Sequence, residues 1–324
     1  MRNVQGGLLS VAVINAIYNI IAQVIGKSSR HHGGIDPIVF STYRDAAACP
    51  ILYCIALSQG RHQENRRSWW PNTKADVARI ALQGFLGIYM NQLLFLLGVE
   101  LTNGTTGSIC NLTLPVFAAA IGMCTGREKF KWSTILGVCL AILGAFCMKV
   151  GTGTAKGDSL LGIVVLLVGS FASAVYYIIQ KETLKRYGAV LVTSWEYFFG
   201  FGFMALSAVL FADYGGESWR LSKIGVIALT FAVLFNSVLK YLLNSICNKY
   251  VSATVLTAWS TIVPVFTAAL SFILLKEPLH LSYLGSLPVM LGIWIVMAAR
   301  ETTSSTTGKA SPASYKHLVE SEQN

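Results

Sequence analysis

Long apolar stretches dominate the chain, and short polar segments separate them. A membrane-spanning helix needs roughly 20 mainly apolar residues, because each residue rises about 1.5 Å across a hydrocarbon core about 30 Å thick. Strands of a membrane barrel would be about 10 residues long with strict alternation, whereas these stretches are longer and apolar on every side. The pattern therefore predicts an all-α polytopic membrane protein with ten transmembrane helices. The predicted spans are Leu8–Ile25, Ile38–Leu57, Ile80–Val99, Ile109–Cys124, Thr134–Met148, Leu160–Ile179, Val190–Ala212, Ile224–Ile246, Thr254–Leu275 and Leu281–Ala299.

Composition and charge agree with this prediction. The 324 residues are 54% hydrophobic and only 12% charged, whereas soluble proteins carry about 25% charged residues. The net charge of +10 is explained by topology rather than by nucleic acid binding, because basic residues collect in cytoplasmic loops. With the N-terminus inside, the inner segments hold 16 Lys and Arg residues and the outer loops hold 7. We expect both termini in the cytoplasm and the lipid bilayer, in the plasma membrane or a vacuolar or other endomembrane, as the main partner.

The two halves of the chain resemble each other. Pro115-Val-Phe-Ala-Ala-Ala recurs 149 residues later as Pro264-Val-Phe-Thr-Ala-Ala. Five spans is an odd number, so the second half must enter the membrane from the opposite side. We predict a first five-helix repeat in residues 1–150, a linker in 151–158, an inverted second repeat in 159–300 and a disordered cytoplasmic tail in 301–324. Inverted repeats are typical of secondary transporters, whose substrate site lies near the midplane between the copies.

Several short motifs point to a known family. They are Asp36-Pro37, Tyr43-Arg44 and Ala46 to Pro50 in helix 2, Gly84-Phe-Leu-Gly87, Asn91-Gln92, Phe95 and Gly98 in helix 3, Asn111, Pro115-Val-Phe and Arg127-Glu128 in helix 4, and Lys276-Glu277-Pro278 after helix 9. In these motifs the chain resembles the EamA-type drug/metabolite transporters, and within them the plant nodulin-21-like group with the walls-are-thin and multiple-amino-acid transporters. The resemblance covers roughly Leu8 to Arg300.

The resemblance implies two EamA-like five-helix repeats, alternating access and a central cavity from helices 1, 2, 3, 4, 6, 7, 8 and 9. It also implies substrates such as amino acids, auxin-like acids or related metabolites. Two features depart from the plant group: Lys249-Tyr-Val-Ser-Ala253 stands where a Gly-Pro step is usual, and Lys240 lies inside helix 8.

Two polar stripes lie inside predicted spans. Asn15, Asn19 and Gln23 recur every four residues in helix 1, and Asn236, Lys240 and Asn244 do so in helix 8. On an α-helix this spacing places side chains on one face, and in a membrane that face must meet protein or water. Each stripe either lines a cavity or forms interhelical hydrogen bonds, which contribute about 0.6 kcal/mol each on average. For Lys240, three interpretations stay open: snorkelling to the helix end, contact with a substrate anion, or a buried ion pair.

Arg44 and Glu196 occupy the same register of helices 2 and 7 when Pro37 is aligned with Ala189. A charge at this depth costs at least about 2.5–3.5 kcal/mol, so each group needs a partner or water. One hypothesis is that Arg44 attracts a substrate carboxylate while Glu196 binds an amine or a proton. The alternative is a structural ion pair, between the two or from Arg44 to another acid, including Asp45.

Further polar or aromatic residues within the spans are cavity candidates, and Asn91 overlays Asn236 when the halves are aligned. These candidates are Asn91, Gln92, Asn111, Tyr176, Gln180 and Trp259.

Enzymatic chemistry finds little support in the sequence. All five histidines lie in loops, at a span edge or in the tail, so no catalytic or metal-binding cluster is expected inside the membrane. We expect no catalytic residue, no metal and no cofactor. The favoured function is transport of a small organic metabolite. The sequence is also compatible with a homodimer. The alternatives are a non-transporting receptor or scaffold on a transporter fold, or a channel.

Overall fold

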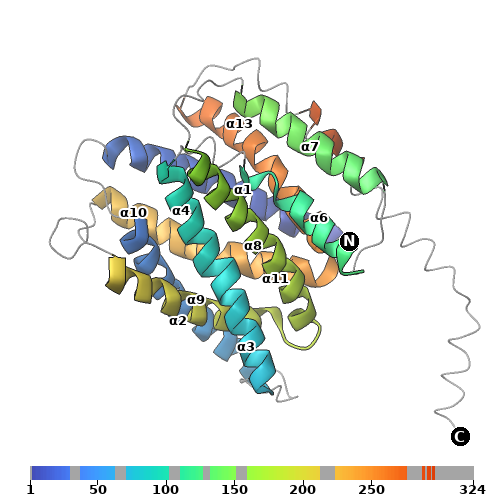
Figure 1. The fold of residues 1–324 in the computed structure, drawn as a ribbon. Helices are drawn as coiled ribbons and strands as arrows, with labels where there is room; N and C mark the ends of the chain where they lie inside the picture. Colours follow the sequence, from blue (N-terminus) through green and yellow to red (C-terminus); the bar gives the residue numbers. More distant parts are fainter. Residues whose placement is uncertain are drawn as a thin grey trace, which may run out of the picture.

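The protein is described by a computed structural model that covers residues 2–29, 37–62, 71–101, 110–126, 132–150, 159–211 and 223–275, with seven further positions between 287 and 295. Every regular element in these ranges is a helix, and the helices pack side by side in one bundle (Figure 1). The predicted linker and tail, and most of the tenth predicted span, lie outside the described residues.

The helices follow the predicted apolar stretches. In the first half they are α1 (Arg2–Ser29), α2 (Pro37–His62), α3 (Lys74–Gln83), η1 (Gly84–Met90), α4 (Asn91–Leu101), α6 (Leu114–Cys124) and α7 (Trp132–Val150). In the second half they are α8 (Leu160–Leu184), α9 (Ala189–Phe211), α10 (Lys223–Phe231), η3 (Ala232–Leu239), α11 (Lys240–Tyr250), α12 (Ala253–Ala258), η4 (Trp259–Ile262) and α13 (Val263–Leu275). Within the described residues, five helices are long and apolar enough to cross a membrane by length and composition.

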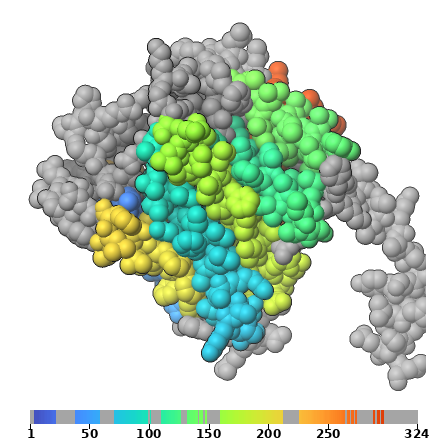
Figure 2. Space-filling model, in the orientation of Figure 1, coloured from blue at the N-terminus to red at the C-terminus, as the bar shows by residue number. Residues whose placement is uncertain are grey.

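The outer surface of the bundle is apolar. Leu160 and Ile227 are 77% and 71% exposed, and many other large hydrophobic side chains point outward. Figure 2 shows one face of the bundle, where α3 and α4 run beside α8. An apolar surface this extensive is costly in water, so its natural environment is lipid.

Contacts between the two halves come in matched pairs. Helix α1 packs on α11 and α13, as α8 packs on α4 and α6. Likewise α2 packs on η3, as α9 packs on η1, and the α2–α9 contact is its own counterpart. Exchanging the halves therefore reproduces these contacts, as expected when two repeats meet around a pseudo-two-fold axis.

The third helix of each half carries a π-helical segment at the same place. Segment η1 separates α3 from α4, and η3 separates α10 from α11. The two composite helices begin at Lys74 and Lys223, and their last α-helical segments begin at Asn91 and Lys240, so both boundaries lie 149 residues apart. This register pairs Asn91 with Lys240, and the overlay of Asn91 on Asn236 was wrong. π-Helical turns are rare and frequently occur at functional sites.

A buried carboxylate joins the start of α3 to the turn between α8 and α9. The Asp76 Oδ2 atom accepts hydrogen bonds from the hydroxyls of Thr73, at 2.9 Å, and Tyr187, at 2.8 Å. Arg186 approaches the other oxygen at 3.4 Å. Burial, and the hydrogen bond to Asp76, raise the pKa of the Tyr187 phenol, so it stays a hydroxyl donor at neutral pH. This Asp76 cluster fastens the first half to the second.

Candidate functional site

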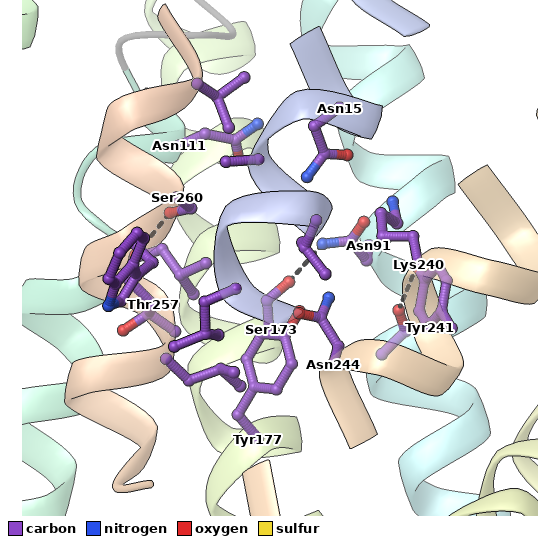
Figure 3. Close-up of a pocket in the computed structure, with 18 of the residues that line it drawn as sticks. Asn15, Asn91, Asn111, Ser173, Tyr177, Lys240, Tyr241, Asn244, Thr257 and Ser260 are labelled. Carbon is purple, nitrogen blue, oxygen red and sulfur yellow. Dashed lines mark hydrogen bonds between the residues drawn. The ribbon is translucent and has the colours of Figure 1, made fainter. Parts of the chain in front are cut away.

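A polar cavity lies between the two halves, with a volume of about 240 Å³. Its wall comes from α1, η1, α4, residues 111–114, α8, α11 and the α12–η4–α13 helix (Figure 3). Ligand pockets in proteins span roughly 300–1,000 Å³, so this cavity suits a small solute. Each half supplies three helices, which correspond to predicted helices 1, 3 and 4 and to their counterparts 6, 8 and 9.

Neutral polar groups make up most of the hydrophilic lining. They are Asn15, Asn19, Asn91, Asn111, Ser173, Tyr176, Tyr177, Tyr241, Asn244, Thr257, Ser260 and Thr267. Among the described lining residues, Lys240 alone carries a formal charge. A solute in this cavity would therefore meet many hydrogen-bonding groups and a single cation.

Hydrogen bonds cross the cavity from one half to the other. The Asn91 amide on α4 donates to the Ser173 hydroxyl on α8, and both side chains are seen in Figure 3. The Asn19 amide on α1 lies 3.5 Å from the Thr267 hydroxyl on α13. These bonds hold the walls together and can be exchanged for bonds to a solute, because both partners face the cavity.

Lys240 stands at one side of the cavity. Its Nζ lies 4.7 Å from the centre of the Tyr241 ring, a cation–π contact. The side chain is half-buried and lines the cavity, so in this structure it does not snorkel to the end of the helix. No carboxylate oxygen of the described residues lies within 4.0 Å of its Nζ. The buried ion pair considered for Lys240 is therefore not formed there.

Glu196 lies directly behind the cavity wall. Its carboxylate accepts hydrogen bonds from the Tyr176 hydroxyl at 3.1 Å and from the Gln180 amide at 3.0 and 3.2 Å. The Asn248 amide donates to the Gln180 carbonyl at 2.9 Å, which fixes the orientation of that side chain. Because Tyr176 lines the cavity and touches Glu196, it separates the carboxylate from the solute space.

Arg44 is also outside the cavity lining. Its Nε lies 3.2 Å from Asp45 Oδ1, and both residues are buried, at 7% and 0% exposure. This is the structural ion pair with Asp45 that the sequence left open, and Arg44 has no ion pair with Glu196 among the described side chains. The matched register of Arg44 and Glu196 does hold, because each is eight residues into its helix. Helices α2 and α9 pack against each other and supply no lining residue.

The predicted site residues thus divide into two groups. The cavity brings together Asn15, Asn19, Asn91, Asn111, Tyr176, Lys240 and Trp259. Outside its lining are Arg44, Gln92, Gln180, Glu196 and Asn236, and the side chain of Gln23 is not among those described. Gln92 is buried beside Asp45 without a hydrogen bond of good geometry.

Asn236 is separated from the cavity although it shares the predicted stripe. It lies in η3, where π-helical i→i+5 bonding replaces the α-helical i→i+4 pattern. Its side chain is buried, at 5% exposure, and is not part of the described lining. Lys240 and Asn244 lie in the α-helical segment α11, and both line the cavity.

Several lining residues were not among the predicted ones, although the sequence carried a signal for some. Ser260 follows the predicted Trp259, whereas Asn244 already belongs to the predicted helix 8 stripe. Ser173 lies one helical turn before Tyr176, so it could have been found by helical spacing. Among the described residues, no group of three metal-ligating side chains occurs.

Comparison with known proteins identifies the family. The model of the EamA-like transporter family matches the chain twice, over residues 6–150 and 160–298. The chain belongs to the EamA-like transporter family. Both matches together cover most of the chain, so the EamA-like repeat accounts for both halves of the helical bundle.

The relatives of this EamA-like protein include bacterial and plant proteins. The uncharacterized transporter YetK of Bacillus subtilis is 26% identical over 71% of this chain and 70% of its own. A WAT1-related protein of Arabidopsis thaliana is 23% identical over 83% of this chain and 76% of its own. A solved crystal structure shares the fold with a TM-score of 0.72, at 11% identity, over 92% of this chain and 98% of the other.

These relatives confirm the predicted superfamily and its plant branch. They support a multi-pass membrane transporter of small solutes and, at family level, a protein that is not an enzyme.

Proposed function

We propose that this EamA-like protein carries a small organic metabolite across the bilayer by alternating access, with the cavity as its substrate site. The observation that carries the proposal is the composition of the cavity wall. Each half contributes three helices, and each wall helix has its counterpart in the other half. A site shared in this way between two repeats can open to either side when the repeats rock against each other.

The proposed architecture is ten transmembrane helices in two inverted five-helix repeats. Matched contacts between the halves support the repeat relation, and the excess of basic residues in the inner segments supports cytoplasmic termini. Inversion explains why equivalent helices approach the cavity from both halves. In this architecture the two repeats would move against each other at their interface, where the cavity lies.

Tracer counterflow in proteoliposomes tests the proposal. Purified protein is loaded with an unlabelled solute, and entry of the same labelled solute is followed for a panel of amino acids and organic acids. A carrier accumulates label transiently when preloaded. Flux that ignores preloading indicates a channel, and binding without any flux indicates a receptor or scaffold.

A matched pair of substitutions links the flux to the cavity. Ser260→Phe places a ring into the cavity lining, and Ser10→Phe makes the same change on the exposed face of α1. We expect Ser260→Phe to reduce counterflow at least about tenfold, which is about 1.4 kcal/mol, while Ser10→Phe retains it. Full counterflow in the folded Ser260→Phe protein would refute this cavity as the substrate site.

A further inference from the structure

The charge of the cavity is set by one side chain. Lys240 is the only formally charged residue of the described lining, and no Asp or Glu contributes to that lining. In Figure 3, Lys240 and Asn91 stand on one side of the pocket and Thr257 and Ser260 on the other, with Ser173 and Asn244 between them. The cation is therefore concentrated at one end of a mostly neutral cavity.

The two buried acids behind the cavity wall, Asp45 and Glu196, already have partners. Asp45 is paired with Arg44 at 3.2 Å, and Glu196 accepts hydrogen bonds from Gln180 and Tyr176 on the far side of the wall. Arg44, Asp45 and Lys240 influence one another electrostatically, and together they carry a formal charge of +1. This excess positive charge has no counter-ion among the described side chains of the cavity.

An unmatched charge in a membrane-embedded site is costly, and a bound anion would remove most of that cost. Asn91 and Asn244 add amide donors to the lining, and an anion accepts hydrogen bonds from such groups. An ammonium group would find no carboxylate in the described lining and would be repelled by Lys240.

We propose that Lys240 is the specificity-determining residue of this transporter and selects monoanionic solutes, such as monocarboxylates, over zwitterions and neutral analogues. The proposal rests on the proposed transport function and narrows its substrate class. The lining also includes Leu8, Leu256 and Trp259, and Thr257 and Ser260 lie on the side away from Lys240. The preferred solute therefore carries its negative charge at one end and an uncharged group at the other.

Binding to the purified full-length protein in detergent tests the selectivity without requiring transport. The probes are sets of three compounds on one skeleton: a carboxylate, its neutral primary amide and the corresponding α-amino acid, with aromatic and with aliphatic skeletons. Ligand-induced thermal stabilisation gives an apparent Kd for each compound. For at least one skeleton, we expect the carboxylate to bind at least about tenfold more tightly than the other two members of its set.

Three variants assign the selectivity to Lys240. Lys240→Gln removes the charge, and Lys240→Arg keeps it. Lys185→Gln removes an exposed lysine that pairs with Glu182 outside the cavity. Hydrogen bonds to charged groups typically contribute enough to change affinity roughly ten- to hundredfold. Carboxylate affinity should therefore fall by that factor in Lys240→Gln alone, with the amide affected less than about threefold.

The outcomes separate this proposal from the transport function. Carboxylate-selective binding that Lys240→Gln abolishes, without counterflow in liposomes, supports the anion site and refutes transport. Counterflow with no preference for carboxylates over amides supports transport and overturns the anion site. If no carboxylate of any set binds more tightly than its amide to the wild type, the proposal fails whatever the variants do.

Discussion

Tyr176→Phe removes a single hydroxyl at the boundary between the cavity and the buried Glu196. The ring of Tyr176 lines the cavity, and its hydroxyl donates to Glu196 Oε2 at 3.1 Å. Phenylalanine keeps the ring and therefore the shape of the wall. The substitution removes this hydrogen bond, and the 2.6 Å bond that the Tyr176 hydroxyl accepts from the Gln180 amide, without changing the packing of the ring.

The expected magnitude follows from the partners of Glu196. A hydrogen bond to a charged group contributes about 1.5–3 kcal/mol, and one between neutral groups about 0.5–1.5 kcal/mol. Glu196 is fully buried, at 0% exposure, and the Gln180 amide still donates to it once the hydroxyl is gone. Because water has no access to replace the lost bond, we expect Tyr176→Phe to lower the free energy of unfolding by about 1.5–3 kcal/mol if Glu196 is ionised.

Unfolding by SDS in mixed micelles measures this free energy, and Tyr177→Phe is the matched control. Tyr177 is the neighbouring residue and also lines the cavity. In the described part of the chain, its hydroxyl forms none of the hydrogen bonds that hold Glu196. We expect Tyr177→Phe to change the free energy of unfolding by less than about 0.5 kcal/mol.

A double-mutant cycle with Glu196→Gln isolates the pair. Residues in one hydrogen-bond network typically show interaction energies of about 0.5–3 kcal/mol, so the two substitutions should not be additive. Additive effects, or a Tyr176→Phe protein as stable as Tyr177→Phe, would refute a structural role for the bond between Tyr176 and Glu196.

Three further predictions concern the ion pair, the contact between halves and the topology. Asp45→Asn leaves Arg44 buried without its counter-ion, and breaking a buried pair typically costs about 3–5 kcal/mol; wild-type stability of the purified variant would contradict this. Tyr187→Phe removes the 2.8 Å bond to Asp76, and we expect a loss of about 1.5–3 kcal/mol in SDS unfolding, with an unchanged value counting against the Asp76 cluster. Tags at the N-terminus and after Glu301 should both be accessible only from the cytoplasm, and tags on opposite sides would exclude an even number of spans.

The helical architecture could be predicted well from the sequence because hydropathy is a local property. Each long apolar stretch has to satisfy its backbone within lipid, and a helix does so without help from distant residues. The repeat was equally accessible, since Pro115 and Pro264 open matching motifs. In the structure these prolines fall at or next to the starts of α6 and α13, where the missing N–H of proline costs little. The predicted fourth helix is shorter than expected, because a turn at Leu112 and Thr113 precedes α6.

The site was predicted only in part, because its geometry depends on packing between distant helices. Asn236 is buried in η3 outside the described lining, although the sequence pattern placed it in one stripe with Lys240. Glu196 was correctly singled out as a buried acid. Its separation from the cavity arises from Tyr176 and Gln180 on another helix, which a single-helix pattern cannot reveal. The sequence also does not reveal how closely η1 approaches α8 at the cavity wall. Any side chain at Gly87 would overlap the Tyr176 ring.

The two halves share a backbone design but differ in the chemistry they present to the cavity. Asn91 and Lys240 each begin the α-helical segment that follows a π-helical one, and both line the cavity. One is neutral and the other is cationic, so equivalent backbone positions present different groups from opposite sides. In alternating access between inverted repeats, the halves exchange conformations while their side chains stay where they are. A symmetric lining would let a solute bind in two opposite orientations with equal affinity. In the proposed cycle, the asymmetry between Asn91 and Lys240 would instead favour one orientation of the solute, with its charged end held by the second half.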